Sequence, residues 1–225
     1  MCWLLLYAIA LQETHAQEEC PSAKAMFCTT KMDITLKSAF VKSYKPFLCD
    51  AETDGGRWIV IQRRVHKDTS FNRNWTDYKN GFGTTCTDYW LGNDLIHEIT
   101  ALNQFELRFD MTYKGNAYYA TYKNFKVGNE ASKYIMTIGE FTGNVSNNFI
   151  TQNSSMFSTP DRDNDAASGN CAGGYQAGWW YKACHMTNLN GHFDTSVMGK
   201  GVIWYSVTTD YDSLSSVEMK IRKMS

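Results

Sequence analysis

The stretch that decides the fold runs from Asp161 to His185 and reads Asp161-Arg162-Asp163-Asn164-Asp165-Ala166-Ala167-Ser168-Gly169-Asn170-Cys171-Ala172-Gly173-Gly174-Tyr175-Gln176-Ala177-Gly178-Trp179-Trp180-Tyr181-Lys182-Ala183-Cys184-His185. It opens with carboxylates at alternate positions, followed by small residues and glycine. Such a pattern suits a hard cation that takes several oxygen ligands. The EF-hand pattern fails, because Ala166 and Ala172 stand where that loop needs Gly and Glu. On spacing alone, a calcium loop and a solvated acidic turn both remain open.

The second half of the stretch is an aromatic segment between Cys171 and Cys184. A disulfide closing a loop of this size would stabilise the fold by roughly 3 kcal/mol in the chain-entropy model. It would also preorganise an aromatic surface beside the acidic loop. We expect Trp179 and Trp180 in the core. Tyr175 is followed by a polar residue among glycines, so we expect it to be exposed, where a tyrosine offers both a ring and a hydroxyl to a ligand.

Cysteine usage points to an extracellular protein. Residues 1–11 form an apolar run too short to span a bilayer, and residues 1–16 are predicted to be a signal peptide. A buried N-terminal strand or helix is the alternative. Cleavage before Gln17 would remove Cys2 and leave an even number of cysteines, which suggests three disulfides; they are Cys20, Cys28, Cys49, Cys86, Cys171 and Cys184. Sequons at Asn74, Asn144 and Asn153 agree with secretion and predict glycosylation there.

Composition and charge exclude several classes of protein. The 225 residues carry 22 Lys and Arg against 23 Asp and Glu, and predicted cleavage removes Glu13, which leaves 22 of each sign. A strongly basic nucleic-acid binder is therefore excluded, and recognition must be local. No later stretch has the ~20 apolar residues of a membrane span. Nucleophile-elbow, zincin and Walker motifs are absent, so we expect no enzyme.

The periodicity predicts a largely β, turn-rich protein with few helices. Residues 105–113 and 217–222 alternate between apolar and polar, as half-buried antiparallel strands do. Three further strands are predicted at 58–61, 117–127 and 202–207. Short helices are predicted at 70–79 and, capped by Asn93, through Ile99. Residues 142–190 lack a regular pattern, and their disulfide and tryptophans favour a stapled functional surface over disorder.

At these residues the chain resembles the fibrinogen C-terminal, or fibrinogen-related, domain over about residues 28–224. The matching motifs are Cys49-Asp50-Ala51-Glu52-Thr53-Asp54-Gly55-Gly56-Arg57-Trp58, Gln62-Arg63-Arg64, Gly81-Phe82-Gly83, Trp90-Leu91-Gly92-Asn93, Asp163-Asn164-Asp165, Asn170-Cys171-Ala172, Gly178-Trp179-Trp180-Tyr181, Cys184-His185, Asn188-Leu189-Asn190-Gly191 and Met219-Lys220-Ile221-Arg222. The chain looks most like the invertebrate secreted members that serve as lectins in innate immunity.

The resemblance implies an α+β fold: a twisted antiparallel sheet flanked by short helices, with a loop-rich, calcium-binding C-terminal subregion. After a signal peptide (1–16) and a short lead (17–27), the domain would occupy 28–225, with subregions of about 28–70, 71–150 and 151–225. Two family disulfides are implied, Cys28–Cys49 and Cys171–Cys184. Cys20 and Cys86 are then left for an extra bridge, with Cys20–Cys49 as an alternative.

The resemblance also implies the site residues. Calcium would be held by the side chains of Asp163 and Asp165 and by the carbonyls of Ala167 and Gly169. An acetyl-binding pocket would lie beside it, with a cis peptide at Ala183–Cys184. The residues at pocket positions are Tyr175, Ala183, Cys184, His185, Met198 and Gly199. Met198-Gly199 stand near the place of a second family aromatic followed by a small residue, so Met198 offers apolar contact without a hydroxyl.

The resulting hypothesis is a secreted, calcium-dependent pattern-recognition lectin that binds acetylated or other glycans on microbial surfaces. The alternative is a protein-ligand module that binds a receptor or clotting-type partner through the same pocket, and the Met198 departure favours it. Single sugar sites bind weakly, so avidity normally requires several copies. The sequence holds no collagen repeat or heptads, so we expect either that the domains themselves form a homo-oligomer or that the chain is a truncated or accessory family member. We expect no nucleic-acid partner and no membrane span.

Overall fold

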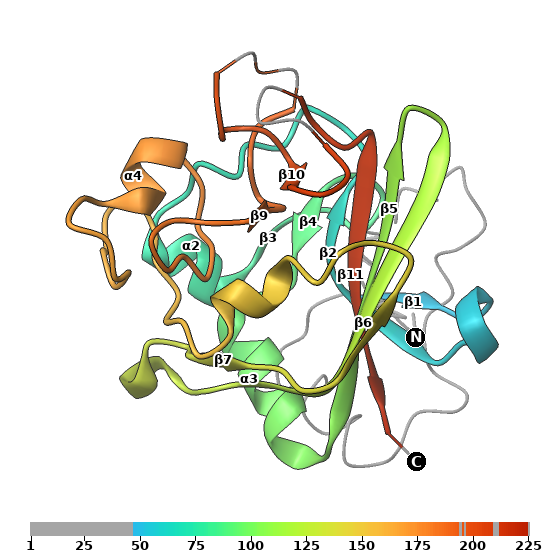
Figure 1. Cartoon of the computed structure of the whole chain (residues 1–225). Coiled ribbons are helices and arrows are strands. Elements are labelled where there is room, and N and C mark those ends of the chain that lie inside the picture. Colours follow the sequence, from blue (N-terminus) through green and yellow to red (C-terminus); the bar gives the residue numbers. More distant parts are fainter. Residues whose placement is uncertain (1–46, 194, 196, 209–211, 225) are drawn as a thin grey trace, which may run out of the picture.

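The computed structural model describes residues 47–193, 195, 197–208 and 212–224. Nine antiparallel strands form its main sheet, in the order β3-β4-β2-β11-β5-β6-β7, with β1 paired to β2 and β8 paired to β6 (Figure 1). The strands are β1 (Leu48–Asp50), β2 (Trp58–Arg64), β3 (Phe82–Gly83), β4 (Tyr89–Trp90), β5 (Phe105–Tyr113), β6 (Asn116–Val127), β7 (Met136–Thr137), β8 (Phe141–Gly143) and β11 (Ser216–Lys223). A separate pair consists of β9 (Thr187–Asn188) and β10 (Ile203–Trp204).

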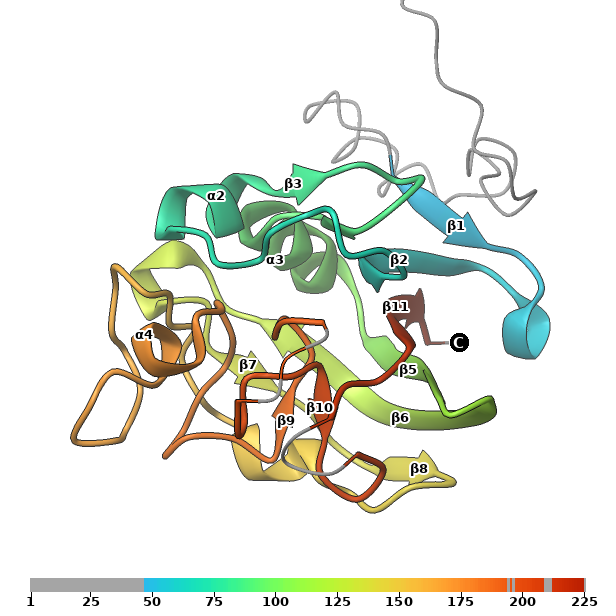
Figure 2. The same ribbon diagram turned by 90° about the horizontal axis from the view of Figure 1, so that it is seen from above.

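The helices are short, as predicted. They are α2 (Trp75–Asn80), α3 (Asn93–Leu102) and α4 (Cys171–Tyr175), with 3-10 turns η1 (Thr53–Gly55), η2 (Glu130–Ser132) and η3 (Phe149–Gln152). Figures 1 and 2 both place α4 on the far side of the domain from β1 and η1. The α+β prediction with a twisted antiparallel sheet and few short helices is confirmed.

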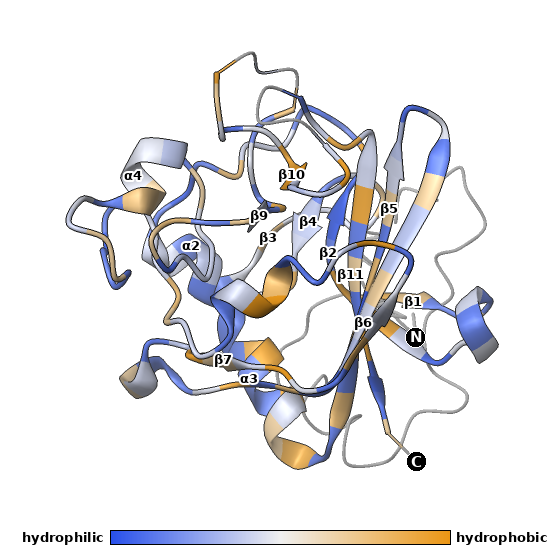
Figure 3. Ribbon diagram, in the orientation of Figure 1, coloured by the Kyte–Doolittle hydropathy of each residue, from blue (hydrophilic) through white to orange (hydrophobic). Residues whose placement is uncertain are grey.

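Alternation of apolar and polar residues is typical of the central strands β5 and β11. In β5, Phe105, Leu107, Phe109 and Met111 are buried and the residues between them are half-buried. Strand β11 lies between β2 and β5, and its Val217 faces Arg64 on one side and Met111 on the other. Figure 3 shows hydrophobic and hydrophilic bands along β11 and β6. Each strand therefore turns one apolar face to the core and one polar face outward.

Aromatic side chains join the sheet to the C-terminal part of the chain. The ring of Phe109 lies 5.0 Å from that of Phe149 and 5.3 Å from that of Trp204. Trp179 and Trp180 are fully buried, as predicted. Residues 142–190 thus form an irregular region that is packed against the core, not a free loop.

Two helix predictions need correction. The segment 70–79 becomes helical only at Trp75, because the Asn74 side chain caps α2 by accepting the N–H of Asp77 at 2.8 Å. Helix α3 is preceded by Gly92 at φ 111°, so the predicted cap at Asn93 is wrong. The Asn93 Oδ1 instead accepts the indole N–H of Trp90 at 3.0 Å. An indole three residues earlier in the chain has taken the side chain that the capping rule assigned to a backbone N–H.

The predicted strand at 202–207 is largely a turn. Only Ile203 and Trp204 pair, with β9. The N–H groups of Val207 and Thr208 both donate to the carbonyl of Trp204, which closes a turn, and Tyr205 is 52% exposed. An apolar run does not distinguish a strand from a buried turn, and here the turn brings Tyr205 to the surface.

A buried ion cluster lies on the outer face of the sheet. The Lys220 Nζ is 2.6 Å from Asp50, 2.8 Å from Asp110 and 3.0 Å from Glu218. Burial by itself would lower the pKa of Lys220, but the carboxylates of Glu218 and Asp110 raise it above its ordinary value. Burial would raise the pKa of Asp50, yet hydrogen bonds from Lys220 and Thr53 hold it well below its usual range. Both groups are therefore charged at neutral pH.

Predictions for the N-terminal part fall mostly outside the described residues. Cys49 and Cys86 each take part in a disulfide, whereas their predicted partners Cys28 and Cys20, the signal peptide and the lead lie outside those ranges. Within the described residues, no helix has the length and apolarity to cross a membrane.

Candidate functional site

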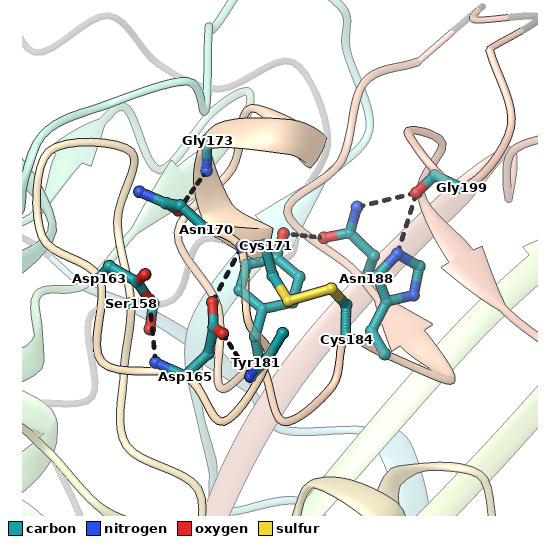
Figure 4. The surroundings of a disulfide bond; sticks show 12 residues. Ser158, Asp163, Asp165, Asn170, Cys171, Gly173, Tyr181, Cys184, Asn188 and Gly199 are labelled. Carbon is teal, nitrogen blue, oxygen red and sulfur yellow. Dashed lines mark hydrogen bonds between the residues drawn. A yellow bond between two sulfur atoms is a disulfide. The ribbon is translucent and has the colours of Figure 1, made fainter.

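The acidic loop at 161–170 holds two carboxylates side by side (Figure 4). The Asp163 Oδ1 accepts the N–H of Asp165 at 3.1 Å. The Asp165 carboxylate in turn accepts the N–H of Ala167 on one oxygen and that of Cys171 on the other, both at 2.9 Å. Alternate spacing therefore curls the chain around its own carboxylates, as short polar side chains do in turns.

The loop is anchored on both sides. The Asn164 side chain donates to the carbonyl of Phe157, and the Asn164 N–H donates to the Ser158 hydroxyl. The Asn170 Oδ1 caps α4 by accepting the N–H of Gly173 at 2.7 Å. The predicted calcium residues are thus positioned by fixed neighbours before any ion binds.

The donor set of this loop fits calcium. Besides the two carboxylates, the carbonyls of Ala167 and Gly169 accept no hydrogen bond from any described residue, so main-chain oxygens remain available. Within the described residues no three His, Cys, Asp or Glu side chains form a metal-binding group. A cation here would therefore depend on carbonyls as well as carboxylates, which is chemistry that suits calcium.

The electrostatics of the loop agree with that fit. Burial raises the pKa of Asp165, the N–H groups of Cys171 and Ala167 oppose the rise, and the nearby Asp163 carboxylate adds to it. Two acidic groups held this close repel each other, and a divalent cation would relieve the repulsion.

A disulfide links the acidic loop to the predicted pocket. Cys171, at the start of α4, is bonded to Cys184, as the resemblance implied. The Ala183–Cys184 peptide is cis, also as implied. The Cys184 N–H donates to no described residue, so one backbone donor beside the disulfide is available to a ligand.

Three of the predicted pocket residues meet directly. The rings of Tyr175 and His185 lie 4.5 Å apart in a T-shaped arrangement. The His185 Nε2 lies 3.1 Å from the carbonyl oxygen of Gly199. Gly199 has φ +76°, and a Cβ there would lie 2.5 Å from the Tyr175 ring, so glycine is required at this position. Residues 24 positions apart in sequence thus share one small site.

The remaining pocket residues form its rim, with one correction. Ala183 is exposed and Met198 is 57% exposed. Tyr175, which was predicted to be exposed, is half-buried because its ring also stacks on Tyr181 at 6.1 Å. The Tyr175 ring is therefore only partly open to a ligand.

The floor of the site contains residues that were not predicted as site residues. The Tyr181 hydroxyl donates to the Asn188 Oδ1 at 3.0 Å, and the Asn188 amide reaches the same Gly199 carbonyl at 3.4 Å (Figure 4). Burial raises the pKa of Tyr181 well above its ordinary value, so the phenol stays neutral. Both residues lie in the motifs quoted above. No local sequence signal distinguishes Tyr181 or Asn188 from the other buried residues of these motifs.

The sequons differ in accessibility. Asn74 and Asn144 are exposed, whereas Asn153 is half-buried and its Oδ1 accepts the N–H of Ile138 at 3.0 Å. Asn144 also accepts a backbone N–H, that of Tyr119, at 2.7 Å. Asn74 accepts a backbone N–H as well, as the cap of α2, so exposure separates Asn74 and Asn144 together from Asn153.

Comparison with known proteins gives consistent relatives. The family described as "Fibrinogen beta and gamma chains, C-terminal globular domain" matches residues 19–224. Tenascin-R from Gallus gallus is 46% identical over 174 residues, which are 77% of this chain but only 13% of tenascin-R. Fibrinogen-like protein A from Apostichopus parvimensis is 40% identical over 181 residues, 79% of this chain and 64% of that protein. The chain thus spans less than two thirds of these relatives.

Solved structures share the fold. The fibrinogen-like globe domain of human ANGPTL6 has a TM-score of 0.77 and 34% identity, over 79% of this chain and 83% of that chain. A lamprey fibrin D-dimer, complexed with the peptide ligand Gly-His-Arg-Pro-amide, has a TM-score of 0.74 and 32% identity, over 82% and 68% of the two chains. Since the family match also covers nearly the whole chain, the protein belongs to the fibrinogen C-terminal domain family.

Proposed function

We propose that this chain is a secreted, calcium-dependent recognition lectin that binds acetylated glycans on microbial surfaces. Family membership supports the coarser part of this statement, an extracellular ligand-binding module without catalysis. The finer part rests on the site: Tyr175, His185 and the Cys184 backbone lie together, one disulfide away from the acidic loop.

The pairing of an apolar wall with a free backbone donor favours an acetamido group. Its methyl group would contact the ring edges of Tyr175 and His185, and its carbonyl oxygen would accept the Cys184 N–H. Aromatic side chains suit such a ligand because they present an apolar ring and a polar tip.

Calcium would act on the shape of this site. Asp163 and Asp165, with the carbonyls of Ala167 and Gly169, would hold the ion, which supplies positive charge to a loop of paired carboxylates. Asp165 already fixes the N–H of Cys171. Ordering of the loop would therefore reach Cys184 through the disulfide, and ligand binding would depend on calcium without direct contact.

Binding to acetylated beads, with and without a chelator, tests the proposal. We expect retention in calcium, elution by free N-acetylated sugar, and loss of binding in Tyr175→Ala. Tyr118→Ala, a change of a half-buried tyrosine on β6, is the matched control. No retention on any glycan at high valency in calcium would refute the lectin proposal.

A protein ligand is the second candidate, and the rim favours it. Val197, Met198 and Tyr205 are each more than half exposed, and the Tyr205 N–H donates to the Met186 carbonyl, next to His185. The related lamprey fibrin binds a peptide. In this case Met198→Ala and Tyr205→Ala would weaken a pull-down, and free acetylated sugar would not compete.

Agglutination would further require several copies of the site, since avidity multiplies weak single-site affinities. We propose direct homo-oligomerisation of the domain. Light scattering of the secreted protein tests this, and a strict monomer would exclude agglutination by the chain alone.

A further inference from the structure

A cavity of about 200 Å³ lies apart from the Tyr175–His185 site and is lined by none of its residues. Its walls come from two segments far apart in sequence, the end of β2 with the loop to Phe71, and the loop at 190–193. The residues that decide its chemistry are Arg64, Thr69, Ser70, Phe71, His192 and Phe193. From this cavity we infer a binding site for the carboxylate group of a small ligand.

The guanidinium of Arg64 is the central feature. The residue is 3% exposed, and its CZ carbon lies 3.9 Å from the ring centroid of Phe71 and 4.7 Å from that of Phe193. The Nε donates to Asp88 at 3.3 Å, and Nη1 donates to the carbonyls of Gly191 at 2.8 Å and Leu189 at 3.3 Å. The group is therefore fixed in one orientation before a ligand arrives.

One donor of that guanidinium is left over. Nη2 donates to no described residue, although the other two nitrogens are fully engaged. A planar, rigid arginine donor recognises carboxylate oxygens well, because little conformational freedom is lost on binding. The two phenyl rings provide apolar contact for the carbon stem that carries the carboxylate.

A second unused polar atom lies in the same wall. The His192 Nε2 is buried without a hydrogen-bond partner among the described residues. Burial, and then the charges of Arg64 and Lys200, lower the pKa of His192, so the ring is neutral at pH 7. The Gln176 backbone opposes this fall, as a carbonyl that accepts one ring N–H does, so Nε2 of the neutral ring is left as an acceptor. It therefore offers no hydrogen bond to a carboxylate, and anion binding rests on the Arg64 Nη2 donor.

Charge around the cavity permits an anion without strongly attracting one. The negative charge of Asp88 compensates the positive charge of Arg64. Asp88 is fully buried and also accepts the N–H groups of Val65 and His66. On the rim, Lys67 adds a positive charge and Asp68 a negative one. Selectivity would therefore come from the fixed Nη2 donor, and Asp68 would oppose binding.

A small carboxylate and its uncharged analogue test the inference. Propionate is the probe, and propionamide is its uncharged isostere; both are titrated into the ¹⁵N-labelled full chain by NMR. We expect propionate to shift signals of residues 64–71 and 190–193 with a millimolar dissociation constant, as suits about five non-hydrogen atoms. Propionamide should bind at least about tenfold more weakly.

Five variants complete the test. Asp68→Asn should tighten propionate binding about twofold or more, whereas Glu98→Gln, an equal charge change on an exposed position of α3, should leave it unchanged. Ser70→Trp, at an exposed position of the rim, should block the cavity. Tyr175→Ala should not affect propionate, so that failure of the lectin proposal and failure of this one can be told apart.

Arg64→Lys should weaken binding at least about fivefold if the variant folds; if it does not fold, Asp68→Asn and Ser70→Trp decide. Three outcomes would overturn the inference. They are no shift at about 100 mM propionate, equal binding of propionamide, or a dissociation constant that neither Asp68→Asn nor Ser70→Trp changes.

Discussion

Replacement of Lys220 by methionine tests what the buried ion cluster contributes to the fold. Lys220 is 2% exposed and contacts three carboxylates within 3.0 Å. Methionine keeps much of the side-chain volume but removes the charge. The variant would leave Asp50, itself 5% exposed, without its cation.

The size of the effect depends on which cationic partner each of the three carboxylates keeps after the substitution. Removing one partner of a buried ion pair costs about 3–5 kcal/mol, since the other charge stays desolvated. Asp110 would still bind Arg108 at 2.8 Å, and Glu218 would still lie 3.4 Å from Arg63. Only Asp50 loses its cation outright, so we expect a loss of about 3 kcal/mol in the free energy of unfolding, or a fall in melting temperature of about 6–12 °C.

The dependence on pH gives this prediction a second readout. In the native protein the pKa of Asp50 lies below its unfolded value of about 3.9, so its contribution is present above pH ~4 and is lost as the pH falls further. In Lys220→Met, burial acts on Asp50 without the amino group and favours protonation. The difference in stability between the two proteins should therefore shrink between about pH 6 and pH 3.

Urea denaturation at several pH values measures both quantities. Lys123→Met is the matched control, because Lys123 pairs with Glu140 at 2.8 Å on the surface, where it is 53% exposed. That variant should lose less than about 1 kcal/mol. A Lys220→Met loss as small as the control's, or a deficit that grows on acidification, would refute the reasoning.

Three further predictions concern the core, the metal and the glycans. Gly178→Ala should destabilise the domain by about 2 kcal/mol in urea denaturation, because a Cβ would lie 2.5 Å from the Tyr78 ring; an unchanged midpoint would show that the ring can move. Calcium should raise the melting temperature of the native protein, and Asp165→Asn should reduce that rise, since binding to the folded state alone stabilises it; an equal rise in both proteins would remove Asp165 from the ligand set. In secreted protein from eukaryotic cells, Asn74→Gln should remove one glycan by mass spectrometry and Asn153→Gln none, because Asn74 is exposed whereas Asn153 is half-buried; a glycan on Asn153 would contradict this.

Local patterns were sufficient for the strands that have one buried face. The alternation at 105–113 predicted β5 to the residue, because each inward position is sealed by the core. The apolar run 202–207 shows no alternation. How much of it became a strand depended on the residues that could pair with β9, which are Ile203 and Trp204. The capping of α3 failed for a related reason, since Trp90 claimed the Asn93 side chain.

The candidate sites divide in the same way. The residues of the acidic loop are contiguous in sequence. The spacing of Asp163 and Asp165 was therefore sufficient to predict a turn around their carboxylates. The Arg64 cavity could not be predicted, because its carbonyl partner Gly191 lies 127 residues away in sequence. Only the fold shows which donor of Arg64 remains unused.

The position of β11 has a consequence for how the domain is made. This strand comes last among the described elements but lies in the middle of the sheet, between β2 and β5. About 150 residues separate the end of β2 from the start of β11, which corresponds to roughly 8–30 s of synthesis on a ribosome. Throughout that time β2, and after its own synthesis β5, has an unpaired strand edge toward the place of β11, the kind of surface that promotes aggregation. The nascent chain therefore depends on protection until its final strand emerges, and the sheet then closes in one late step.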